Sequence, residues 1–142
     1  MHRTICFLCV LFMFMAVGYT FANNNITLEI NGVVVQGGLV YVAVYSSEND
    51  YKAETPSTRF VLNPTNKRIS HNLELPNGEY VVSVFQDVNS NGVLDANIFG
   101  IPREPVGITN YNGIGRPGSF QGLKVPVYNN SSGITVNIVN IR

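Results

Sequence analysis

The stretch LVYVAVY at residues 39–45 decides the fold class, because it joins β-branched and aromatic residues in one unbroken apolar run. A second run, YVVSVF at residues 80–85, has nearly the same character. Strands that are apolar on both faces lie in the middle of a packed sheet. We therefore predict that these two segments form the middle of the core.

The rest of the chain after residue 22 follows a period of two or offers short apolar segments, as half-buried strands do. Further strands are expected at residues 26–31, 58–62, 69–75, 123–128 and 134–141. Pro126 marks its segment as an edge strand, because proline cannot donate to a ladder. Helix is expected only as a turn or two around residues 50–54.

About seven short strands joined by Gly, Asn and Pro predict an all-β fold, a single antiparallel β-sandwich of the immunoglobulin-like or transthyretin-like kind. The join Pro76-Asn77-Gly78 predicts a hairpin between residues 69–75 and 79–85. Residues 96–119 form a long loop that holds Phe99, Ile101, Ile108 and Tyr111. Because these apolar residues argue against disorder, we predict one long ordered loop folded over an end of the sandwich.

Residues 1–22 are predicted to be a secretory signal peptide, with His2 and Arg3 as a basic start and an apolar run at residues 5–17. That run is short for a membrane span, although a retained anchor is the alternative. Cleavage would leave residues 23–142 as one β-sandwich domain. Both cysteines, Cys6 and Cys9, would leave with the leader, so we expect a periplasmic or secreted protein without disulfides or thiol chemistry.

The charges are balanced, with nine Lys and Arg against nine Asp and Glu, and no basic tract occurs. Nucleic acid and anionic membrane surfaces need clustered cations, so neither is an expected partner. No membrane span is expected after cleavage of the leader. His71 is the only histidine beyond the leader, which leaves too few ligands for zinc or copper.

The stretch DVNSNGVLD at residues 87–95 matches the first nine places of a calcium loop. Its candidate ligands are the side chains of Asp87, Asn89, Asn91 and Asp95 and the carbonyl of Val93. Ile98 stands where a bidentate Glu would complete the shell, so Glu104 would have to serve and the affinity should be weak. The alternative is a turn in which these side chains cap backbone amides.

The succession LPNGEYVVSVFQDVNSNGVLDANIFGIPREPVGITN, followed by RPGSF, resembles the bacterial domain of unknown function 2141 family. Members of that family are small and secreted or periplasmic, so the resemblance implies a location and a β-sandwich fold but no activity. The segment around Pro76 also resembles transthyretin-like and carboxypeptidase-regulatory-like modules.

The leading hypothesis for function is a non-enzymatic binding or structural module that contacts a protein or glycan partner through the end formed by residues 87–119. The rival is a hydrolase or isomerase that uses Asp87, Asp95, Glu104 or His71 as acid and base in a long-loop pocket. An enzyme requires at least two of these groups to converge in a concave site.

Two further groups of side chains could contribute to binding. Arg103 and Glu104 could bind a ligand, but an ion pair that steadies the loop is the expected arrangement. Tyrosines could line a carbohydrate or peptide surface. Packing in the core or at its rim is expected for Tyr41, Tyr45 and Tyr80.

Overall fold

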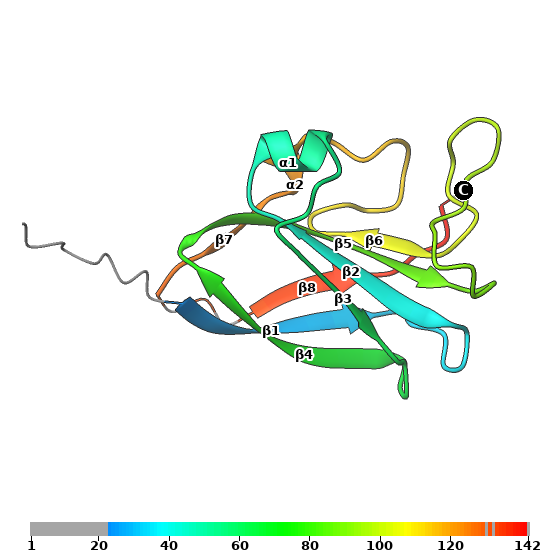
Figure 1. The fold of residues 1–142 in the computed structure, drawn as a ribbon, viewed down its shortest axis with the longest axis horizontal. Coiled ribbons are helices and arrows are strands. Elements are labelled where there is room, and N and C mark those ends of the chain that lie inside the picture. The colour runs from blue at the N-terminus through cyan, green and yellow to red at the C-terminus, as the bar shows by residue number, and fades with distance from the viewer. Residues whose placement is uncertain (1–22, 130, 132, 142) are drawn as a thin grey trace, which may run out of the picture.

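The computed structural model describes residues 23–129, 131 and 133–141, and shows two sheets packed face to face (Figure 1). The first sheet has the spatial order β4 (Arg68–Pro76), β1 (Asn23–Asn31) and β8 (Gly133–Asn137). The second has the order β3 (Thr58–Leu62), β2 (Leu39–Tyr45), β5 (Gly78–Asp87) and β6 (Val106–Ile108), and β7 (Val125–Val127) pairs with the start of β5. The predicted all-β sandwich is confirmed.

The core lies between the two sheets and is built from alternate residues of the strands. Leu28 and Ile30 of β1, Val42 of β2 and Val84 of β5 are all almost completely buried. Burying an aliphatic side chain of this size stabilises the fold by roughly 1.5–3 kcal/mol relative to leaving it exposed. The alternation read from the sequence therefore identifies the inner faces correctly.

The strand count and the pairing differ from the prediction in two respects. β6 is an eighth strand inside the predicted loop, and β8 pairs parallel with β1, so the sandwich is not wholly antiparallel. Three residues are too few to reveal a period in the sequence. The Gly107 position is tight, because a Cβ there would lie 2.6 Å from the Asn137 carbonyl oxygen. Long-range pairing with β5, together with this close approach to the end of β8, thus defines β6, and local pattern does not.

The predicted hairpin at Pro76-Asn77-Gly78 is wrong, because the chain crosses there from one sheet to the other. β4 pairs with β1 and β5 pairs with β2. Neither Asn77 nor Gly78 has the positive φ that the tight hairpin turn requires. Instead, the hydroxyl of the buried Tyr80 donates to the Pro76 carbonyl at 3.0 Å and holds the crossing.

Pro126 lies in β7, which pairs with β5 alone, so the predicted edge strand is confirmed. The segment predicted as a strand from residue 123 instead starts in a short helix, α2 (Phe120–Leu123). In the described part of the chain, no helix is long and apolar enough to cross a membrane. The predicted signal peptide, residues 1–22, lies outside the described residues.

Candidate functional site

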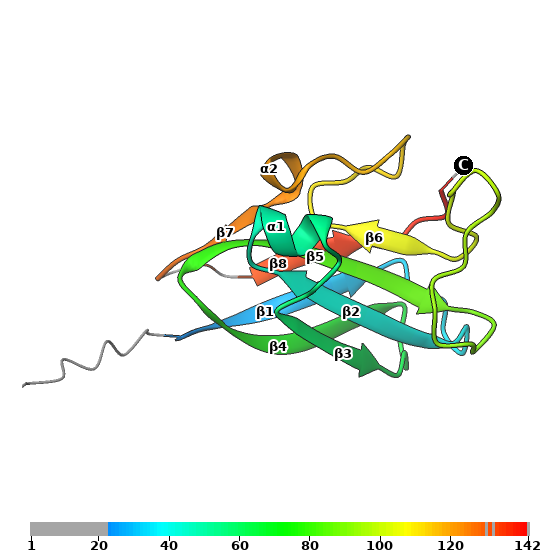
Figure 2. The same ribbon diagram turned by 45° about the horizontal axis from the view of Figure 1, so that its top comes forward.

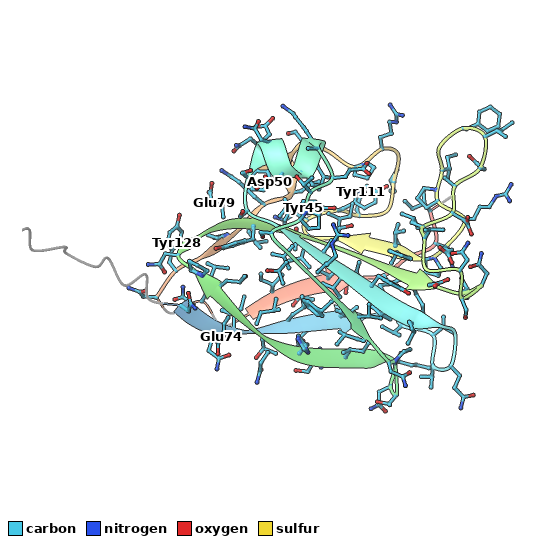
Figure 3. All side chains as sticks on the ribbon, viewed as in Figure 1. Tyr45, Asp50, Glu74, Glu79, Tyr111 and Tyr128 are labelled. Carbon is cyan, nitrogen blue, oxygen red and sulfur yellow. The ribbon has the colours of Figure 1, made fainter. Side chains whose placement is uncertain are left out.

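Two short helices cover one half of the outer face of the second sheet (Figure 2). α1 (Glu48–Lys52) begins after Ser47, whose Oγ accepts a hydrogen bond from the backbone N–H of Asp50 at 3.1 Å. Between the helices and the sheet lies a second, smaller apolar cluster. Its buried members are Val81, Phe120 and Leu123, and Tyr45, Tyr51, Ile108 and Tyr111 pack against them. Figure 3 labels Tyr45 and Tyr111 of this cluster.

The other half of this outer face is open and forms a groove of about 850 Å³, which we call the aromatic groove. The floor carries the outward-facing side chains of the two central strands: Tyr41, Ala43, Ser83 and Phe85. The walls come from α1 and the segment after it, from β3, and from the loops at residues 92–94 and 116–118. Grooves of this size with a largely apolar lining are typical ligand sites.

Aromatic rings dominate the groove. Tyr41 and Phe85 are cross-strand partners, and their rings stack with centroids 4.9 Å apart and an angle of 8° between their planes. Tyr45 and Tyr51 meet edge to face, with centroids 5.3 Å apart. All four rings are half-buried, so each keeps some surface in contact with solvent. The outer face of a two-sided sandwich thus carries a platform on which a ligand can stack.

Polar groups surround this platform. Burial first, and then the Glu54 carboxylate, raises the pKa of Tyr45, while Arg59 lowers it by less. Burial also raises the pKa of Tyr51. Both phenols are therefore neutral at pH 7 and can donate and accept hydrogen bonds. Arg59 and Arg116 also line the groove, and the structure places neither in an ion pair with a described carboxylate.

The sequence did not identify the aromatic groove. Tyr80 is buried and Tyr45 packs at the rim of the smaller cluster, as expected, whereas Tyr41 lies on the outer face in the groove. The alternation of Val40, Val42 and Val44 with Tyr41 already places the tyrosines on the opposite face. Only the folded chain shows which part of that face the two helices leave open.

The Asp87–Asp95 loop adopts a hydrogen-bonded turn next to the groove. Asp87 is 2% exposed, and its two carboxylate oxygens accept from the backbone N–H groups of Asn91 at 3.1 Å and Gly92 at 2.8 Å. The Oδ1 of Asn89 also accepts from Asn91, and the Oδ1 of Asn91 accepts from Val93. These contacts match the alternative in which Asx side chains cap amides.

Asp95 is the last residue of the loop, and its side chain contacts the two asparagines. The Nδ2 groups of Asn89 and Asn91 donate to Asp95 Oδ2 at 2.6 Å and 2.8 Å. Calcium requires oxygen ligands, so both amides would have to turn before these side chains could enclose an ion. Among the residues that the structure describes, no three His, Cys, Asp or Glu side chains are arranged to hold a metal. The arrangement as it stands fits a turn better than a calcium shell.

Glu104 joins the loop from nine residues beyond its last member, Asp95. Its carboxylate is 3% exposed, and its oxygens accept from the N–H groups of Val88 at 2.9 Å and Asp95 at 3.2 Å. The expected ion pair with Arg103 is absent, because Glu104 turns inward to these amides while Arg103 stays exposed. The sequence analysis proposed Glu104 as the carboxylate that would have to complete a calcium shell, and in the structure Glu104 does contact this loop.

His71 lies apart from the Asp87–Asp95 loop, which we call the acidic loop. It occupies the middle of β4 in the first sheet, where its half-buried ring stacks on Phe60 with centroids 4.6 Å apart. Neither His71 nor any of the three carboxylates proposed for the rival enzyme lines the aromatic groove.

The loop at residues 96–119 is folded, but its tip does not pack. Ala96 bridges Pro102, and the N–H of Arg103 donates to the Asp95 carbonyl, which closes a small finger at residues 95–103. Within the finger, Asn97 Oδ1 accepts from the N–H groups of Phe99 and Ile101. Phe99 is nonetheless 76% exposed. The prediction that this ring covers the sandwich is wrong, because the finger points its side chains outward, whereas Ile108 and Tyr111 do pack under the helices.

Comparison with known proteins places the chain in a family. No curated protein and no solved structure matches the chain significantly. The model of one family matches residues 28–135, which span the sandwich from β1 into β8 and include both the acidic loop and the aromatic groove. The chain therefore belongs to the family described as "Uncharacterized protein conserved in bacteria (DUF2141)".

Proposed function

We propose that this chain is a non-enzymatic binding module, secreted or periplasmic, and that its ligand lies in the aromatic groove. The observation that carries the proposal is the half-buried stack of Tyr41 and Phe85, which stays accessible on the outside of the sandwich. Large rings usually bury their surface in a core or an interface. A paired platform that stays open, with polar side chains around it, is suited to holding a ligand.

The lining of the groove supports binding over catalysis. Glu54 is the single carboxylate among the lining residues, and no histidine or cysteine stands beside it. The rival hypothesis requires at least two of Asp87, Asp95, Glu104 and His71 to converge in one concave site. None of these four residues lines the groove, which supports a binding role for the groove over the rival hydrolase or isomerase.

A backbone-resolved NMR titration tests the proposal. The probes are a uronic acid oligomer, a neutral sugar oligomer and a proline-rich peptide. For the probe that binds, we expect changes in backbone chemical shift that are confined to β2, β5 and the groove walls. Tyr41→Ala should remove these changes. Shifts that instead cluster on the finger or on the β4–β1–β8 sheet would contradict the proposal.

A second candidate function is weak calcium binding by Asp87, Asn89, Asn91, the Val93 carbonyl and Asp95. It is supported by two buried carboxylates, Asp87 and Glu104, that the described ion pairs do not neutralise. Buried charges are usually paired or bind metals. With so few formal charges in the loop, the Kd should be roughly 0.1–1 mM, the range of extracellular modules.

A further inference from the structure

We propose that the ligand of the aromatic groove is an acidic oligosaccharide, an inference that rests on the binding function proposed above. It combines three features of the groove: the ring platform, the lack of free backbone groups on its floor, and two guanidinium groups that form no ion pair with a described carboxylate. Each feature selects a different part of the ligand.

The ring platform selects a ligand with flat apolar faces. Tyr41 and Phe85 present stacked rings, and a sugar ring has a C–H face that packs on such a surface while its hydroxyl groups point outward. The neutral hydroxyls of Tyr45 and Tyr51 and the carboxylate of Glu54 stand where they can meet those hydroxyl groups.

The backbone of the floor disfavours a peptide strand as the ligand. β2 is paired with β3 on one side and with β5 on the other, so its N–H and C=O groups are already used in ladders. A peptide would bring its own backbone groups, which need partners when they are buried. The floor offers it no sheet edge, and the free edge of β3 lies at the groove wall, so a peptide could add as a strand only beside the ring platform and not on it.

The two guanidinium groups select an acid. Arg59 comes from β3 at one margin of the sheet, and Arg116 comes from the loop that follows β6 at the other margin. Both are exposed and both line the groove. Arginine binds carboxylate and sulfate groups through paired hydrogen bonds, so a uronate or a sulfated sugar complements these positions. With Glu54 as the single acid in the lining, the positive groups are in excess.

Calorimetric titration with matched sugars tests this inference. The probes are tetragalacturonate and the galactose oligomer of equal length, which has hydroxymethyl groups in place of carboxylates. We expect the acid oligomer to bind at least about tenfold more tightly than the neutral one, and less tightly as salt is added. Arg59→Gln and Arg116→Gln should each weaken its binding by about tenfold.

Arg103→Gln is the matched control, because it removes the same charge from an exposed arginine on the finger, outside the groove. It should leave the affinity unchanged. Equal affinity for acidic and neutral oligomers, or equal losses in all three arginine variants, would overturn the inference.

A wider set of acids separates this inference from the proposed function. Glucuronate-containing and sulfated galactose oligomers extend the test to both kinds of acid group. If none of the acidic sugars binds and the proline-rich peptide shifts the groove signals, the sugar inference fails while the binding function stands. If no probe perturbs the groove, both fail.

Discussion

Tyr41 and Phe85 lie opposite each other in the β2–β5 ladder, and their rings stack on the outer face of the sandwich with an angle of 8° between their planes. Because each ring keeps an exposed surface, this pair should matter more for binding than for stability. Tyr41→Ala removes the ring pair, worth about 0.5–1.5 kcal/mol, and the burial of only part of the ring, so in urea denaturation it should cost less than the truncation of a fully buried core residue. Leu28→Ala, in the core, should cost about 2–5 kcal/mol. If Tyr41→Ala lowers the free energy of unfolding as much as Leu28→Ala does, the Tyr41–Phe85 pair serves stability and not binding.

The finger should contribute little to stability. Phe99 is 76% exposed, so Phe99→Ala should change the free energy of unfolding by less than about 0.5 kcal/mol. Phe120→Ala is the matched control, because that ring is buried under the helices, and it should cost about 3–5 kcal/mol. Chemical denaturation of both variants makes the comparison. A Phe99→Ala loss above about 2 kcal/mol would mean that the ring is buried in solution.

Glu104 should anchor the base of the finger to the acidic loop. Glu104→Ala removes the acceptor of the Val88 and Asp95 N–H groups, and leaving a buried donor unpaired costs about 1–3 kcal/mol. Glu74→Ala, at an exposed position of β4, should cost less than about 0.5 kcal/mol. The two variants can be compared by thermal unfolding. Equal melting temperatures for the two variants would show that the Glu104 hydrogen bonds contribute nothing to stability.

Calcium binding can be tested through stability. At about 10 mM calcium, a Kd of roughly 0.1–1 mM would stabilise the folded chain by roughly 1.4–2.7 kcal/mol. Magnesium should do much less, because it demands a tighter octahedron. Asp87→Ala should abolish the calcium-dependent shift in melting temperature. Equal melting temperatures of the parent chain in chelator and in calcium would leave the loop as a turn only.

Alkaline pH should weaken the fold through the groove tyrosines. Burial raises the pKa of Tyr45 and of Tyr51 above the ordinary value of 10.0. The unfolded chain therefore releases the two phenol protons at a lower pH than the folded chain does. The free energy of unfolding is unaffected by these groups below pH 10.0 and falls as the pH rises above that value. Urea denaturation at neutral and alkaline pH should show a smaller loss for the Tyr45→Phe, Tyr51→Phe double variant than for the parent. An identical loss would contradict this assignment.

Local pattern in the sequence accounts for much of the sandwich. Residues 39–45 and 58–62 were predicted with the bounds that the structure gives them, because β-branched residues and period two are local signals. Sheet partners are long-range properties. Nothing in Pro76-Asn77-Gly78 itself tells whether the chain returns beside β4 or crosses to β2, and the packing of Tyr80 decides it.

The two candidate sites also differ in whether their residues are close together in the sequence. The Asx residues of the acidic loop were visible in the sequence because they lie within nine positions, Asp87–Asp95. The aromatic groove was not, because its floor comes from β2 and β5 and its boundary is set by α1 and α2, which are far apart in the chain. Strand alternation can place Tyr41 and Phe85 on outer faces, but it cannot show which outer face remains uncovered.

The most direct test of ligand binding in the aromatic groove is a crystal structure of the chain grown with tetragalacturonate. We predict a sugar ring packed by its C–H face against Tyr41 or Phe85, with a carboxylate of the ligand paired to Arg59 or Arg116. A sugar bound on the finger or on the first sheet, or a groove closed by Leu94 and Pro117 packed onto the rings, would contradict it.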